Sequence, residues 1–135
     1  MELITLDEKR YVDIGAEDIW NSVYSTALMR LKPIENEITL ALEFLKTGSC
    51  EFGKSQETAR QVNLIRDGLS QIPPEEVIYD YKNINVRAPW SGKISPVVTS
   101  CGNMFTTADG KDLLYELVAI LTYSYIKKTN IIVAE

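Results

Sequence analysis

The sequence contains no histidine, and this absence argues against several kinds of active site at once. Histidine is the most common general base, the base of Ser and Cys triads, and a frequent zinc ligand. Catalysis would have to use carboxylate, lysine or tyrosine side chains instead. The sequence therefore favours a protein that is not an enzyme and that needs no metal or other cofactor.

Cysteines and long apolar runs are also scarce. The only two cysteines, Cys50 and Cys101, lie far apart, which favours free thiols in a reducing compartment, although a single bridge between them is compatible with the count. No apolar run approaches the roughly 18 residues of a membrane-spanning helix, and the N-terminal segment lacks the layout of a signal peptide. We therefore expect a cytoplasmic protein without a membrane partner.

The length and composition are those of one globular domain. The chain has 135 residues, of which 45% are hydrophobic and 24% charged, close to the averages for soluble proteins. We expect a single domain over residues 1–135 that folds around one core.

The charge is negative and unevenly distributed. There are 19 acidic and 14 basic side chains and no basic run, so nucleic acid is a poor direct ligand. Residues 1–80 carry 15 acidic against 8 basic side chains, whereas residues 81–135 carry 4 against 6. A charged partner of the more acidic, N-terminal part should therefore be basic.

The spacing of the apolar residues predicts both strands and helices. Alternating residues near the two chain ends are typical of strands, and three- and four-residue spacing between them is typical of helices. The predicted elements are a hairpin over 3–6 and 11–14, helices over 17–31, 38–47, 55–69 and 107–127, and strands over 77–81, 93–98, 104–106 and 131–133. They lack regular βαβ alternation, which predicts an α+β fold, with helices packed on one face of an antiparallel or mixed sheet.

Two helix starts carry residues that favour N-caps. Ser55 is expected to cap the third helix, and Thr107 or Asp109 the last one, because their side-chain oxygens can accept hydrogen bonds from exposed amides.

The residue types that most often mark a ligand site do not form a recognisable one here. The glycines fit no phosphate-binding frame, and the carboxylate pairs, such as Glu75 with Glu76, lack metal-ligand spacing. Tyr79, Tyr81 and Trp90 have few basic neighbours, so packing is a better interpretation than base stacking. We expect Trp90 to anchor the long loop that contains it.

The C-terminal part of the chain, from Val77 onward, contains short motifs in a fixed order. V-I-Y-D-Y-K-N-I begins at Val77, A-P-W-S-G-K-I-S-P at Ala88 and M-F-T-T-A-D-G-K at Met104. In this order they resemble the immunity protein 70 family of bacterial polymorphic toxin and contact-dependent growth inhibition systems. The motif residues expected to shape loops and helix ends, and not to contact a partner, are Pro89, Trp90, Gly92, Phe105, Thr107, Asp109 and Gly110.

The resemblance implies an inhibitor that binds and neutralises a cognate toxin domain, the C-terminal domain of a large secreted effector. Many such toxins are nucleases with cationic clefts, into which an acidic protein can be steered. We therefore expect occlusion of the active site or substrate path of a basic nuclease. The acidic residues expected to contact the toxin are Glu35, Glu37, Glu43, Glu51, Glu75, Glu76 and Asp80.

Two alternatives remain open at this point. One is a small enzyme that uses carboxylate or tyrosine chemistry in the loop over 83–109, which a cleft with a carboxyl of raised pKa beside Tyr79, Tyr81 or Ser95 would favour. The other is a non-catalytic adaptor that uses an exposed apolar patch on its helices.

Overall fold

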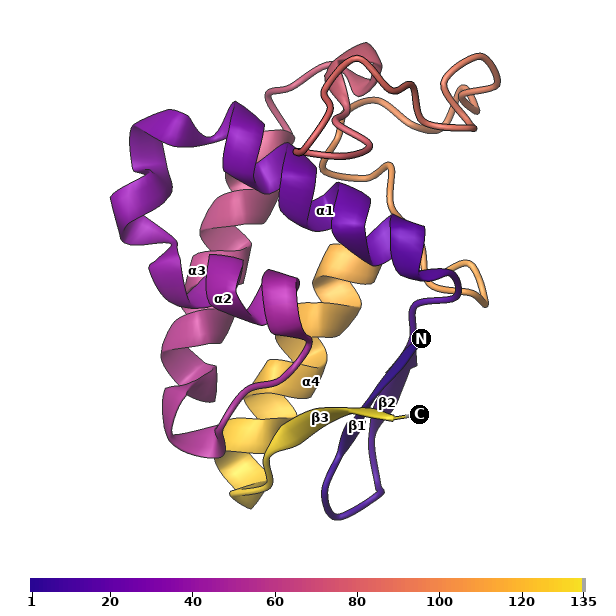
Figure 1. The fold of residues 1–135 in the computed structure, drawn as a ribbon. Coiled ribbons are helices and arrows are strands. Elements are labelled where there is room, and N and C mark those ends of the chain that lie inside the picture. The colour runs from indigo at the N-terminus through magenta and orange to yellow at the C-terminus, as the bar shows by residue number, and fades with distance from the viewer. Residues whose placement is uncertain (135) are drawn as a thin grey trace.

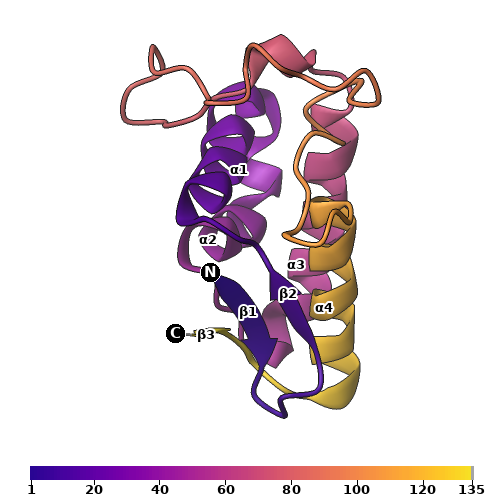
Figure 2. The same cartoon turned by 90° about the vertical axis from the view of Figure 1, so that its right-hand side faces the viewer.

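The computed structural model describes residues 1–134 and has four α-helices on one face of a three-stranded antiparallel sheet (Figure 1, Figure 2). This confirms the α+β class. The elements are β1 (Glu2–Thr5), β2 (Tyr11–Asp13), α1 (Glu17–Arg30), the 3-10 helix η1 (Lys32–Glu37), α2 (Thr39–Thr47), α3 (Phe52–Leu69), the 3-10 helix η2 (Pro74–Glu76), α4 (Leu113–Lys127) and β3 (Ile131–Ala134).

The sheet joins the two ends of the chain, in the order β2-β1-β3. Leu3 of β1 lies opposite Val12 of β2 on one side and Val133 of β3 on the other. Leu3, Val12 and Ile131 are buried against the helices, as expected where alternate side chains of a strand face a core. The predicted hairpin and closing strand are both confirmed.

The predicted helices are present, and their ends have physical causes. Two carboxylates, Glu17 and Asp18, begin α1, and α2 ends at Gly48, which has φ +78°. A Cβ on Gly48 would lie 2.6 Å from Cγ2 of Val133. Only glycine therefore allows α2 to end this close to β3.

Both predicted helix caps are wrong. Ser55 lies inside α3, which already begins at Phe52, and its hydroxyl donates to the Phe52 carbonyl. The cap of α4 is Asp112, whose carboxylate accepts a hydrogen bond from the Tyr115 amide.

Thr107 and Asp109 lie instead in the turn before α4. The Thr107 hydroxyl donates to the Asp109 carboxylate, and Thr106 and Asp112 form an isolated β-bridge that closes the turn. Because Gly110 adopts φ +86° between them, the chain cannot enter the helix until after Lys111.

The three strands predicted between the third and last helices are also wrong. Residues 93–98 contain one turn, at Pro96 and Val97, and no strand, and Thr106 contributes only the bridge to Asp112. Residues 77–81 lie along α1, where the hydroxyl of Ser22 donates to the carbonyl of Ile78 at 2.8 Å. The amide of Tyr81 donates to the Ser25 hydroxyl at 2.9 Å. Buried hydroxyls of a helix therefore satisfy the backbone groups that a neighbouring strand would otherwise bind.

Thr26 contacts both backbone groups of Ile78 and allows a test of these helix contacts. Its buried hydroxyl accepts from the Ile78 amide at 3.0 Å and donates to the Ile78 carbonyl at 3.1 Å. Thr26→Val keeps the shape but leaves a buried amide without a partner, so we expect the free energy of unfolding to fall by about 1–3 kcal/mol. Urea unfolding measures this, with Thr39→Val at an exposed position as the control. Equal stability of the two variants would contradict the assignment.

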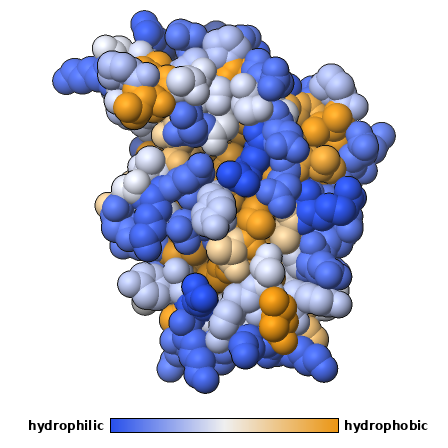
Figure 3. All heavy atoms as spheres, turned by 180° about the vertical axis from the view of Figure 1, so that it is seen from behind, coloured by the Kyte–Doolittle hydropathy of each residue, from blue (hydrophilic) through white to orange (hydrophobic). Residues whose placement is uncertain are grey.

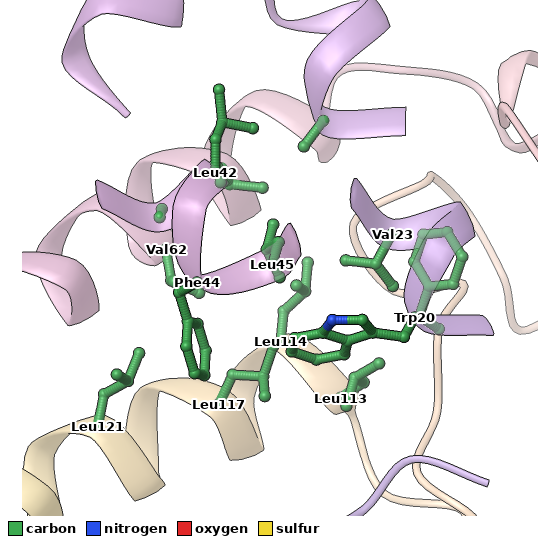
Figure 4. Close-up of a cluster of buried hydrophobic side chains, with 14 of the residues drawn as sticks. Trp20, Val23, Leu42, Phe44, Leu45, Val62, Leu113, Leu114, Leu117 and Leu121 are labelled. Carbon is green, nitrogen blue, oxygen red and sulfur yellow. The ribbon is translucent and has the colours of Figure 1, made fainter. Parts of the chain in front are cut away.

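The core lies between the helices and the sheet (Figure 4). The rings of Trp20 on α1 and Phe44 on α2 meet edge to face, with 5.7 Å between their centroids. Leu114, Leu117 and Leu121 of α4 are fully buried around them. None of the helices within residues 1–134 has both the length and the apolar character needed to cross a membrane.

Candidate functional site

An acidic groove lies between α2, the start of α3 and β3. It has a volume of about 250 Å³. Glu43 of α2 and Glu51, directly before α3, line it together with apolar atoms of Phe44, Ile131 and Ile132. The structure thus brings two of the seven predicted contact residues into one concave site.

Backbone hydrogen bonds hold the groove in shape. After the turn at Gly48, Cys50 pairs with Ile131 of β3 through two bonds of 2.9 and 3.0 Å. The amide of Phe52 then donates to the side-chain oxygen of Asn130 at 2.9 Å. The loop between α2 and α3 is therefore fastened to the last strand.

The carboxylates of the groove are available to a partner. Glu43 and Glu51 are exposed, and within residues 1–134 neither forms an ion pair. Lys54 is the single cation among the lining residues. Burial raises the pKa of the half-buried Cys50 thiol. The Thr58 hydrogen bond and the Lys54 charge act against this shift, and the charges of Glu51 and Glu43 act with it. The groove therefore carries a net negative charge.

The other predicted contact residues lie elsewhere. Glu35 and Glu37 are on η1, where Glu35 forms an ion pair of 3.0 Å with Lys32. Glu75 and Glu76 are exposed on η2. This short helix follows the C-terminal end of α3, whereas the groove lies at the N-terminal end (Figure 1).

Helix α3 separates Glu75 and Glu76 from the groove. It has 18 residues and is therefore about 27 Å long. Asp80 follows η2, and its carboxylate accepts a hydrogen bond from the Lys82 amide at 3.0 Å, which shapes its own loop. The seven acidic residues do not form one continuous site.

Trp90 packs against residues from the other two motifs. Its ring meets Tyr79 at 5.8 Å and Phe105 at 6.5 Å between centroids, and its Nε1 donates to the Met104 sulfur at 3.4 Å. These contacts tie the long loop to the body of the protein, as expected of Trp90. Pro89 and Gly92 are exposed on that loop. That the motif residues avoid a toxin stays a prediction.

A second hollow, of about 280 Å³, lies beside Ser95 in the region considered for catalysis. Within the described part of the chain, its lining residues include no carboxylate. The Asp109 pKa is lowered, mainly by the hydrogen bond from Thr107. The Tyr79 hydroxyl donates to Asp18 at 2.6 Å, which raises the pKa of the tyrosine. The arrangement that would have favoured an enzyme is not found there.

The arrangement of the Cys, Asp and Glu side chains tests for a metal site and for a disulfide. Over residues 1–134, no three Cys, Asp or Glu side chains come together as ligands for a metal ion. Cys50 and Cys101 are both free thiols, in agreement with the favoured interpretation of the sequence.

Sequence reasoning missed the part of the groove that comes from the end of the chain. Asn130, Ile131 and Ile132 line the same groove as Glu51, although they are distant from it along the sequence. The β-branched tail indicated a strand, but no sequence signal showed that it would lie beside the loop between α2 and α3.

No curated protein and no solved structure matched the chain. A family model described as Immunity protein 70 matches residues 4–133, which is nearly the whole chain. The similarity therefore reaches from β1 into β3 and includes every residue of the acidic groove. The chain belongs to the immunity protein 70 family.

Proposed function

We propose that this protein neutralises a cognate toxin domain with a basic substrate cleft, a nuclease effector, by occluding its active site or substrate path. Membership of an immunity protein family implies a toxin as the partner. The observation that carries the finer proposal is the acidic groove, in which Glu43 and Glu51 have no ion-pair partner in residues 1–134.

The groove suits a lysine or arginine side chain of such a toxin. These side chains have an apolar stem and a charged end. Ile132, which is 39% exposed, and the half-buried Leu40 supply apolar surface for the stem, while the carboxylates of Glu43 and Glu51 supply acceptors for the charged end. If that lysine or arginine normally binds a phosphate of the substrate, it can no longer do so while it is bound in the groove.

The overall charge supports the same partner. The excess of seven acidic side chains in residues 1–80 attracts a basic domain at long range and accelerates encounter. Backbone hydrogen bonds join the loop between α2 and α3 to β3, so the surface of the groove is preformed. Inhibition then needs binding alone, and we assign no chemical step to this protein.

Cys50 provides a test, because it lines the groove and is the more accessible of the two thiols. Cys101 is fully buried, which raises its pKa to about 11, so a thiol reagent should modify Cys50 first in the folded protein. We expect a toxin domain encoded beside this protein to slow the modification of Cys50 as the complex forms. Mass spectrometry identifies the modified residue.

An unrelated basic protein of similar charge serves as the control and should leave the rate unchanged. Inhibition of the toxin without protection of Cys50 would refute the groove as the binding site. Failure of the protein to bind its neighbour and to rescue poisoned cells would refute the function itself.

A further inference from the structure

The outer face of α4 carries apolar and aromatic side chains that no other part of residues 1–134 covers. Tyr115 is 58% and Ile126 65% exposed. Between them lies a shallow hollow of about 410 Å³, lined by Val118 and Ala119 among others. Seen from behind, apolar residues run through the middle of this side of the molecule with hydrophilic residues around them (Figure 3). Such a patch on a small protein marks an interaction surface.

Along this face, large and small side chains follow one another in an order that is the same from either end of the helix. Tyr115, Ala119, Thr122 and Ile126 follow one another at intervals of four, three and four positions, which places them on one side of the helix. Their sizes are large, small, small and large. An antiparallel second copy of α4 would therefore place Tyr115 against Ile126 and Ala119 against Thr122, with the small residues allowing a close crossing.

The charges along α4 favour the same arrangement. Glu116 and Lys127 are separated by three helical turns, so they lie on one side of the helix but about 16 Å from each other. They cannot pair within one chain. In an antiparallel pair, Glu116 of each copy approaches Lys127 of the other, and the two helix dipoles also oppose each other favourably.

Two arginines extend the face on either side. The guanidinium of Arg66 lies over the ring of Tyr115 at 5.6 Å, and that of Arg10 over the ring of Tyr123 at 5.2 Å. Tyrosine and arginine are enriched at protein interfaces and among the residues that contribute most to binding.

We propose that the outer face of α4 binds a second copy of this chain, and that the two α4 helices cross antiparallel in a symmetric dimer. No residue lines both this face and the acidic groove, so the dimer presents two free grooves. The inference goes beyond the proposed function and does not depend on it. A contact through one helix lies at the small end of protein interfaces, so the dimer forms and dissociates with concentration.

Analytical ultracentrifugation of the full chain, without any toxin, tests this. The wild type is expected to shift from monomer to dimer as its concentration rises. Ala119→Arg, which places a charge at the crossing point, should remain monomeric, and Thr99→Arg on an exposed loop should behave as the wild type. A wild type that is monomeric at every concentration, or a dimer that Ala119→Arg leaves intact, would overturn the proposal.

A charge exchange tests the orientation of the two helices. Glu116→Lys and Lys127→Glu should each raise the dimer dissociation constant by about tenfold, because two ion pairs become two repulsions. The double variant restores the pairs with their signs exchanged and should dimerise as the wild type. Loss of the dimer in the double variant, with melting temperature unchanged, would overturn the antiparallel arrangement.

Discussion

The double variant Glu43→Lys, Glu51→Lys is expected to bind the cognate toxin domain about 100-fold more weakly than the wild type, a loss of ~3 kcal/mol. Both carboxylates line the groove and lack an ion-pair partner within residues 1–134, so a cation of the toxin that reaches them becomes paired and loses water. Reversal leaves that cation facing two like charges. The effect should be larger than that of either single variant, because the two residues share one site.

The test is the dissociation constant of the complex with the toxin domain, measured at low and at high salt. The wild type should lose affinity as salt rises, and the double variant should show a weaker dependence. Glu35→Lys is a matched control, because it makes the same change on η1, where Lys32 already neutralises the carboxylate. Its expected effect is small. An unchanged constant and salt dependence for the double variant would refute the binding of a cation in the groove.

Phe44→Ala is expected to lower the free energy of unfolding by about 3–5 kcal/mol. The side chain is only 1% exposed, and its ring meets the ring of Trp20 edge to face. Alanine would leave a cavity between α1 and α2 and remove this aromatic contact. Because small domains are stable by only about 5–15 kcal/mol, the variant would lose much of its stability.

Phe52→Ala gives the comparison, because it deletes the same atoms from a side chain that is 40% exposed at the start of α3. Urea unfolding of both variants should show a large loss for Phe44 and a loss below about 1 kcal/mol for Phe52. Similar losses would mean that the contact with Trp20 does not stabilise the core.

The elements predicted correctly are those whose signal lies within a short stretch of chain. The apolar stripe of α4 and the alternation around Leu3 each indicate that one face of the element is buried. This pattern is the same whichever other elements pack against that face. The helix ends at Gly48 and before Pro33 were equally local, because glycine permits the positive φ of a helix end and proline fixes its own φ and lacks an amide hydrogen.

The errors arose where distant groups replaced the expected partners. Residues 77–81 alternate like a strand, but Ser22, Ser25 and Thr26 of α1, far away along the sequence, bind their backbone. Likewise, the turn closed by the bridge between Thr106 and Asp112 comes before α4, so the helix begins later than predicted and its cap is Asp112. A propensity cannot show which of several hydrogen-bond partners is present in the folded protein.

The sequence by itself determined the fold class, the helices, the terminal strands, the excess of acidic charge over positions 1–80 and the motifs that indicated the family. Only the tertiary structure decided which acidic side chains share a site. Glu43 and Glu51 line one groove because the loop between α2 and α3 hydrogen-bonds to Asn130 and Ile131, while Glu75 and Glu76 lie beyond the other end of α3. Charge and periodicity are properties of the chain, whereas a groove depends on contacts between segments that the sequence separates.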